Sequence, residues 1–184
     1  MSDELTRMEE KKVVSQEMFR GTMLHLNVDL VDLPNDKLDH REFVRHVGAV
    51  CIIPVTEDGK IVVERQFRYP IGQIVTEIPA GKLNDRDEDP LEAAKRELRE
   101  ETGLTADAWE NLGVFYPAPA YSDEKITMFL ARGLHQGPCE RDDDEFMDVL
   151  EMPLAELEEQ VLSGEVTDAK TQIAVLKAAK LLKK

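Results

Sequence analysis

One stretch, residues 81–104, constrains the fold of this chain more than any other, because it combines a helix pattern with an unusual density of charge. It reads GKLNDRDEDPLEAAKRELREETGL. Apolar residues recur at helical spacing up to Leu98 and predict a helix with one buried face. Pro90 suits the first helical position, and Gly103 suits the residue just after the last turn. The sequence therefore predicts a helix that begins near Pro90 and ends before Gly103.

Three carboxylates follow the rim of the apolar face of this helix. Glu97 and Glu101 are one turn apart beside the buried stripe, and Glu100 lies further round, near solvent. Like charges at this spacing cost roughly 0.2–0.5 kcal/mol per pair, whereas a hard cation such as Mg2+ prefers carboxylate oxygens and is completed by substrate phosphates. Arg96 can bridge to a neighbouring carboxylate. The pattern indicates a divalent-cation site for phosphate chemistry, and the alternative is a solvated helix with an ordinary Arg96–Glu100 pair.

The spacing of these residues resembles the Nudix box, a loop-helix-loop motif of the Nudix hydrolase superfamily. Its places are occupied here by Gly81, Glu88, Arg96, Glu97, Leu98, Glu100, Glu101, Gly103 and Leu104. Six residues separate Gly81 from Glu88, where the family usually has five. The extra residue falls in the loop, so we expect a bulge there and an intact helix.

Length and charge limit the other possibilities. A chain of 184 residues fits one domain with at most a small appendage. The net charge of -15 argues against nucleic acid or an anionic membrane as a partner. It does not argue against a phosphate substrate, because bound metal and a few arginines can reverse the sign inside a pocket. No apolar stretch is long enough to span a membrane, and the charged start MSDELTRMEE is not a secretion signal, so we expect a cytoplasmic protein.

The rest of the chain predicts an α+β fold. Residues 12–46 alternate apolar and polar positions, which is typical of two or three antiparallel strands. Further strands are predicted at 48–55, 60–67, 74–78, 112–116, 126–131 and 145–150, and helices at 153–163 and 168–182. The turn Glu57-Asp58-Gly59-Lys60 indicates a hairpin. With the box, this order implies a Nudix αβα sandwich with a mixed sheet. We assign residues 1–46 to an N-terminal β-strand dimerisation region and 47–184 to the hydrolase domain.

Sequence blocks outside the box are similar to the ADP-ribose pyrophosphatase branch of the superfamily. They are RHVGAVCIIPV, ERQFRYP, TEIPAGKL, YPAPAYSDE, DDDEF and DAKT. The resemblance implies hydrolysis of ADP-ribose to AMP and ribose 5-phosphate with Mg2+, or with Mn2+ in its place. It also implies a homodimer in which the N-terminal strands cross to the partner subunit and help to shape both active sites.

The same resemblance implies the metal ligands. They are the backbone carbonyl of Ala80 and the carboxylates of Glu97 and Glu101, with Glu100 assisting. The alternative for Ala80 is that it merely begins a turn. Arg96 and Glu100 are also predicted to be catalytic residues. Arg96 orients the metal ligands, and Glu100 assists them.

Four further residues are implied to lie at the substrate. Arg68 matches an arginine that meets the substrate phosphates, although a surface ion pair is the alternative. Glu77 either belongs to the site or supports it from behind, unless it is an exposed strand glutamate. Arg41 and Glu42 match an Arg-Glu pair near the nucleotide, and a solvated strand pair is the alternative for them.

The acidic segment 142–145 carries the candidate general base. Such a run is ordinarily a solvated loop, but in this branch the equivalent loop folds over the substrate and supplies a glutamate that helps to activate water. Branch members place that glutamate at one of two positions, which here hold Asp143 and Glu145. Because Asp143 is shorter by a methylene, we expect Glu145 to be the base and keep Asp143 as the alternative.

The base pocket departs from the branch pattern. Relatives often stack adenine on an aromatic side chain near position 22, where this chain has Gly21-Thr22-Met23. Phe19 or Met23 would have to cover the ring instead. Another nucleoside diphosphate sugar, such as GDP-mannose, is therefore an alternative substrate. A non-catalytic Nudix ligand sensor is a more distant alternative, because sensors of that type tend to lose box carboxylates that this chain keeps.

Overall fold

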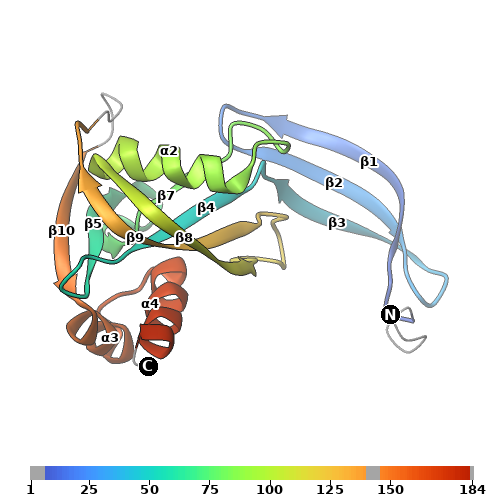
Figure 1. The fold of residues 1–184 in the computed structure, drawn as a ribbon. Helices are drawn as coiled ribbons and strands as arrows, with labels where there is room; N and C mark the ends of the chain where they lie inside the picture. Colours follow the sequence, from blue (N-terminus) through green and yellow to red (C-terminus); the bar gives the residue numbers. More distant parts are fainter. Residues whose placement is uncertain (1–6, 140–145, 183–184) are drawn as a thin grey trace. The chain divides into compact units, whose positions relative to one another are not determined.

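The computed structural model describes residues 7–139 and 146–182, and the chain divides into two units that are considered separately (Figure 1). The N-terminal unit extends to His46 and includes the segment Ala118–Glu124. The larger unit holds Val47–Pro117 and the chain from Lys125 onward. In the described chain, no helix is both long enough and apolar enough to cross a membrane.

The N-terminal unit is built on a three-stranded antiparallel sheet in the order β1-β2-β3, as predicted. Its strands are β1 (Lys11–Arg20), β2 (His25–Asp32) and β3 (Leu38–Arg45). Every residue of β1 is exposed within this chain, and several of them are large and apolar. The segment 118–124 joins the unit through the Val44 N–H, which donates to the Tyr121 carbonyl at 2.8 Å.

In its described residues, the larger unit contains two sheets and three α-helices. The four-stranded sheet has the order β7 (Ala80–Lys82), β4 (Ala49–Pro54), β9 (Ile126–Gln136) and β8 (Leu104–Phe115). Only its β4–β9 pair is parallel, so the sheet is mixed. The three-stranded sheet has the order β10 (Met147–Pro153), β5 (Lys60–Arg68) and β6 (Gln73–Glu77), with the 3-10 turn η1 (Tyr69–Ile71) between β5 and β6. The helices are α2 (Pro90–Thr102), α3 (Leu154–Ser163) and α4 (Ala169–Leu182).

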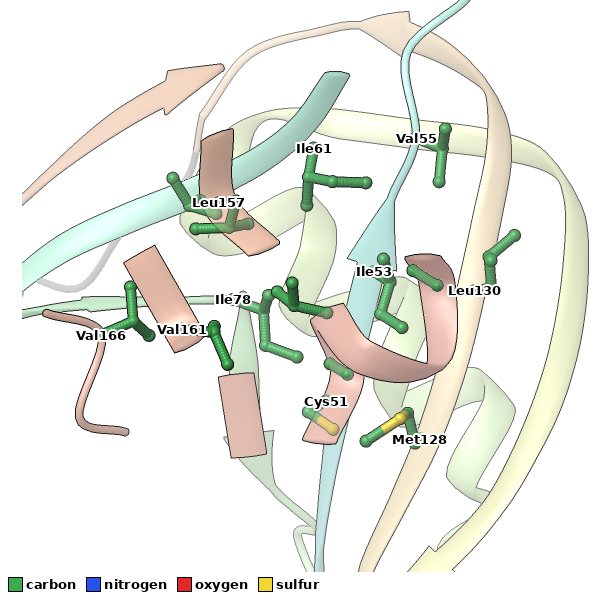
Figure 2. Packing of buried hydrophobic residues seen from close by; sticks show 14 of the residues in the cluster. Cys51, Ile53, Val55, Ile61, Ile78, Met128, Leu130, Leu157, Val161 and Val166 are labelled. Atoms are coloured by element: carbon green, nitrogen blue, oxygen red, sulfur yellow. The ribbon is translucent and has the colours of Figure 1, made fainter. Parts of the chain in front are cut away.

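Strand β4 forms the middle of an αβα sandwich because its side chains alternate between two apolar clusters. Cys51 and Ile53 point into the cluster that α3 and α4 cover, together with Leu157 from α3 (Figure 2). Val50 and Ile52 point the other way, against the apolar face of α2. The predicted α+β sandwich with a mixed sheet is therefore confirmed.

The predicted hairpin at Glu57–Lys60 is only partly right. The turn forms, and the Thr56 N–H donates to the Lys60 carbonyl at 3.0 Å. However, the described pairing beside the turn is a single isolated bridge between Val55 and Ile61, and β4 and β5 belong to different sheets. The turn residues fix the local reversal, whereas the sheet that each strand joins depends on distant partners.

Candidate active site

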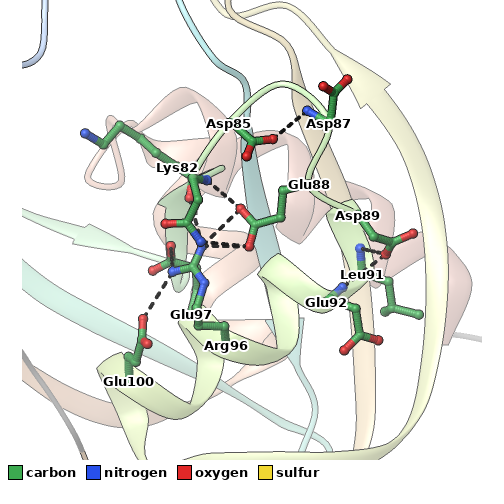
Figure 3. Close-up of polar contacts among 11 residues, drawn as sticks. Lys82, Asp85, Asp87, Glu88, Asp89, Leu91, Glu92, Arg96, Glu97 and Glu100 are labelled. Carbon is green, nitrogen blue, oxygen red and sulfur yellow. Dashed lines mark hydrogen bonds and ion pairs between the residues drawn. The ribbon is translucent and has the colours of Figure 1, made fainter.

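Helix α2 begins and ends where the sequence predicts. Pro90 is its first residue, and the Asp89 carboxylate caps it by accepting the Leu91 N–H at 2.8 Å (Figure 3). Gly103 ends it in the left-handed region with φ 73°, a conformation that only glycine adopts without strain. The apolar face of the helix packs on the sheet through Leu98, so the carboxylate rim is held on a rigid element.

Arg96 is the centre of the charged rim. Its Nη1 donates to Glu97 Oε1 at 2.7 Å and to Glu100 Oε2 at 3.2 Å. Its Nη2 donates to the Lys82 carbonyl at 3.1 Å and lies 3.4 Å from Glu88 Oε1 (Figure 3). Burial alone would lower the pKa of Arg96, but these carboxylates outweigh it and the pKa is raised. One guanidinium thus orients three carboxylates, which is more than the ordinary Arg96–Glu100 pair of the solvated-helix alternative.

The loop before the helix is closed by Glu88. The Asn84 side-chain amide donates to Glu88 Oε1 at 3.0 Å, and the Asn84 backbone N–H donates to Oε2. Residues 84–88 form a turn with bends, and α2 is intact after it. The extra loop residue therefore leaves the helix undisturbed, as expected.

The backbone at Ala80 and Gly81 brings two carboxylates of α2 to one place. The Ala80 N–H donates to Glu101 Oε2 at 3.0 Å, and Glu101 is buried, with 7% of its surface exposed. Glu97 packs so closely on Gly81 that a Cβ atom at this position would collide with the carboxylate. Ala80 itself is paired with Cys51 in the ladder between β7 and β4, so the alternative that it merely begins a turn is wrong.

This donor set fits a hard divalent cation. Within residues 7–139 and 146–182, no group of three His, Cys, Asp or Glu side chains is arranged to hold a metal ion by itself. Mg2+ does not require such a cage, because it is usually bound by one or two carboxylates, waters and substrate phosphates. Glu97, Glu101 and the Ala80 backbone offer oxygen ligands of this kind. The Gly81–Glu97 contact keeps them together, since any larger residue at position 81 would move the carboxylate.

A second charged group, which we call the α4 corner, consists of Arg68, Glu77, Asp168 and Lys170. Glu77 is 2% exposed, so the alternative of an exposed strand glutamate is wrong. Arg68 Nε and Nη2 donate to its two oxygens at 2.6 and 2.8 Å, and Lys170 Nζ also contacts Oε2. Burial would raise the pKa of Glu77, but Arg68 and Lys170 together hold it below the ordinary value of 4.5.

The α4 corner lines a cavity of about 330 Å³. The wall is completed by Ile71, Val75, Thr167 and Ala169. The Arg68 side chain is 44% exposed even though it is bound to Glu77. A buried carboxylate thus orients a guanidinium that stays exposed, and contact of Arg68 with a substrate stays a prediction.

Within the block DAKT, sequence reasoning assigned no role to Asp168, Lys170 or Thr171. Asp168 Oδ1 lies 3.1 Å from Lys170 Nζ, and its Oδ2 accepts the Thr171 N–H at 2.9 Å. One signal was available: a lysine in the first turn of a helix opposes the helix dipole, so it indicates nearby carboxylates.

The remaining candidates are not brought to the box by the described contacts. Arg41 is paired with Glu10 at 2.6 Å and with Asp39 at 2.8 Å, all within the N-terminal unit. Glu42 is exposed on β3 in the same unit. Phe19, Thr22 and Met23 are exposed there as well. Asp143 and Glu145 lie outside the described residues. Contact of these residues with a substrate stays a prediction.

Comparison with known proteins identifies the class. The NUDIX domain model matches residues 44–172, which is most of the chain, so the protein belongs to the Nudix family and the identification from the box is confirmed. The chain is 43% identical to the ADP-ribose pyrophosphatase of Bacillus subtilis, over 91% of each chain. It is 41% identical to the methanol dehydrogenase activator of Bacillus methanolicus, also over 91% of each. A solved structure described as an ADP compounds hydrolase shares the fold, with a TM-score of 0.84 at 22% identity, covering 96% of this chain and 95% of that one.

Proposed function

We propose that this protein hydrolyses the pyrophosphate bond of ADP-ribose, giving AMP and ribose 5-phosphate, with Mg2+ as its cofactor and Mn2+ as an alternative. The observation that carries the proposal is the convergence of Glu97 and Glu101 on the backbone of Ala80 and Gly81. The similarity to the Bacillus subtilis ADP-ribose pyrophosphatase over nearly the whole chain supports the substrate.

In this mechanism the Ala80 carbonyl, Glu97 and Glu101 would hold the metal, with Glu100 assisting. When bound, the cation would supply positive charge for the diphosphate and acidity for the attacking water. Nη1 of Arg96 keeps Glu97 and Glu100 oriented, and the Ala80 N–H holds Glu101.

The other residues act on the substrate and on the proton. Arg68 stabilises negative charge on the leaving phosphate through the face that Glu77 leaves accessible. Glu145 takes the proton of the attacking water, and Asp143 or a box glutamate is the alternative base. Positioning and electrostatics supply most of the rate, because phosphoryl transfer needs little covalent help.

The test is release of AMP and ribose 5-phosphate from ADP-ribose with Mg2+, beside GDP-mannose and an EDTA control. Fast, EDTA-sensitive cleavage of ADP-ribose alone is expected. GDP-mannose is included because the segment Gly21-Thr22-Met23 has no aromatic residue to stack on adenine. A preference for GDP-mannose would leave the proposed mechanism unchanged and would change the proposed substrate. No turnover of these or other nucleoside diphosphates would contradict the proposal and favour a ligand sensor.

The N-terminal unit is proposed to mediate a homodimer in which its strands reach the partner's active site through Arg41 and Glu42. The support is the exposed apolar surface of β1, where Val14, Met18 and Phe19 face solvent in the single chain. A sheet surface of this kind is typical of a protein interface. Light scattering after gel filtration should give twice the mass of the chain, and a monomer would contradict the arrangement. The expected cytoplasmic location stays a prediction that cell fractionation can check.

A further inference from the structure

A lysine in the first turn of α4 occupies a position that the helix dipole disfavours. Lys170 is the second residue of the helix, where partial positive charge repels cations. Its side chain is only 12% exposed, and its ammonium contacts both Glu77 and Asp168. The two carboxylates offset the unfavourable position. We infer that the role of Lys170 is its positive charge beside these carboxylates and not stabilisation of the helix.

The carboxylate that Lys170 contacts is shared with Arg68. Glu77 accepts both Arg68 donors on one side, while Lys170 Nζ contacts Oε2 of the same group. Glu64, also buried, lies directly opposite Glu77 in the ladder between β5 and β6. Like charges directly opposite one another repel, so this part of the sheet concentrates negative charge. With Lys170 neutralising part of that charge, the Arg68 guanidinium keeps positive potential at its accessible face.

The same helical turn also fixes the backbone that leads to the metal-binding segment. The Thr171 hydroxyl accepts the Ile78 N–H at 2.9 Å and donates to Asp168 Oδ2 at 2.6 Å. Ile78 follows Glu77 directly and is two residues before Ala80. The start of α4 therefore holds the C-terminal end of β6 through the Thr171–Ile78 hydrogen bond and the Lys170–Glu77 ion pair.

We propose that Lys170 is a positioning residue, which makes Arg68 an effective ligand for an anionic substrate by sharing the Glu77 carboxylate with it. The proposal rests on the proposed function in one respect only, namely that the anion is a diphosphate. It assigns to Lys170 no contact with the substrate. Its effect should therefore appear in substrate binding and should depend on the presence of Arg68.

The test is a double-mutant cycle on KM. Lys170→Met should raise KM for the diphosphate substrate about tenfold with kcat changed by less than about threefold, since ground-state and transition-state binding weaken together. Lys170→Arg, which keeps the charge, should recover most of the loss. In an Arg68→Met background, Lys170→Met should change KM by less than about twofold. An equal fold-change in both backgrounds would show that Lys170 acts independently of Arg68 and would overturn the proposal.

Two controls exclude a general effect on folding. Lys177→Met removes another lysine of α4, one whose Nζ contacts the Leu112 carbonyl, and it should leave KM unchanged. Lys170→Gln keeps a hydrogen-bond donor without the charge, so it replaces the Met variant in the cycle if that variant does not fold. Thermal unfolding of every variant shows which of them are folded at the assay temperature.

Binding of inorganic pyrophosphate in EDTA, measured by calorimetry on the same variants, separates this inference from the proposed function. If the wild-type protein cleaves no diphosphate yet binds pyrophosphate with the expected Lys170–Arg68 coupling, the proposed function fails and the role of Lys170 stands. If it cleaves ADP-ribose but Lys170→Met has the KM of the wild type, only the role of Lys170 fails. If the wild type binds no pyrophosphate and cleaves nothing, both are overturned.

Discussion

The rim of α2 and the α4 corner are both rich in charge, but they differ in how that charge is balanced. On α2, Arg96 serves Glu88, Glu97 and Glu100, while buried Glu101 is held by a backbone N–H. In the α4 corner, two cations face two carboxylates: Arg68 and Lys170 are paired with Glu77 and Asp168. In these contacts the first region has four carboxylates to one arginine, whereas the four residues of the second are balanced, and Glu64 adds one further carboxylate opposite Glu77.

This difference indicates what each region can bind. In a cluster with more carboxylates than protein cations, a bound external cation reduces the repulsion between the carboxylates. A balanced group gains little from such a cation, but it can hold a guanidinium in a fixed orientation. We therefore expect metal to affect the α2 rim and substrate anions to affect the α4 corner.

Loss of a carboxylate from the α2 rim should have the largest effect on turnover. Glu101→Gln should lower kcat by about 100- to 1,000-fold, the scale of losing one electrostatic contact to the transition state. The protein should stay folded, because Gln can still accept the Ala80 N–H. Steady-state kinetics with ADP-ribose measures the loss. Glu92→Gln is the matched control, since Glu92 is an exposed residue of the same helix paired with Lys95. Near-normal turnover of Glu101→Gln would remove the metal-site assignment.

Addition of Mg2+ should stabilise the protein through the α2 rim alone. At about 100 times its dissociation constant, a ligand adds about 2.7 kcal/mol to the free energy of unfolding. For a chain of this size that corresponds to a rise in Tm of about 5–10 °C. Scanning calorimetry with Mg2+ and with EDTA measures it.

Two variants divide the Mg2+ effect between the regions. Glu101→Gln should lose most of the rise in Tm, whereas Lys170→Met should keep it, because the α4 corner contributes no proposed ligand. Equal loss in the two variants would show that the regions are not separable in the way their charge balance indicates.

The α2 rim and the α4 corner also differ in how much of each could be predicted from the sequence. The α2 rim could be predicted because its determinants are local: Pro90, Arg96 and Gly103 lie on or beside one helix and act at fixed helical spacing. Burial of Glu101 also follows from its place beside the apolar stripe. The contacts of Glu97 and Glu101 with residues 80–81 could be inferred only through resemblance to a family.

In the α4 corner, Arg68 and Glu77 could be inferred only through resemblance, and their pairing with Asp168 and Lys170 could not be predicted, because these residues lie on β5, on β6 and at the start of α4 with no common period. The pairing of Glu77 with Lys170 depends on how α4 docks on the sheet, which no local pattern encodes. The same limit applies to the turn at Glu57–Lys60, whose residues specify a reversal but not the sheets that the two strands join. Strand β8 was predicted only at 112–116, whereas its pairing with β9 extends from Leu104 to Phe115.

A side chain at position 81 should displace the Glu97 carboxylate, because Gly81 lies directly against it. Gly81→Ala would place a methyl group on the Glu97 carboxylate and displace it. We expect a loss of about 10- to 100-fold in metal affinity, the range seen when support of a ligand is disturbed. Titration with Mn2+ followed by electron paramagnetic resonance measures the affinity. Gly59→Ala is a control for glycine replacement, since no atom lies near a Cβ at that turn, although its positive φ will cost some stability. Unchanged Mn2+ affinity in Gly81→Ala would contradict the assignment of Glu97 as a ligand.

The smallest effect is expected in the pH dependence of stability at the α4 corner. Burial would raise the pKa of Glu77, but its two cations lower it below 4.5. Because the folded pKa is lowered, the stabilisation by these pairs is complete above about pH 4.5 and is lost as the pH falls through the folded pKa. Glu77→Gln lacks this contribution at every pH. It should therefore be about 1–2 kcal/mol less stable than the wild type at neutral pH, a figure reduced because Arg68 is half-exposed.

Urea unfolding between neutral pH and about pH 3.5 measures this difference, which should shrink toward the acid end. Glu151→Gln is the matched control: Glu151 is an exposed carboxylate of β10 whose partner Lys60 lies 3.3 Å away, so its loss should cost little at any pH. A difference between Glu77→Gln and the wild type that stays constant with pH would mean that the α4 corner is stabilised by packing rather than by its charges. The α4 corner would then differ from the α2 rim in packing and not in charge balance. Lys170 could not act on Arg68 through the charge of Glu77.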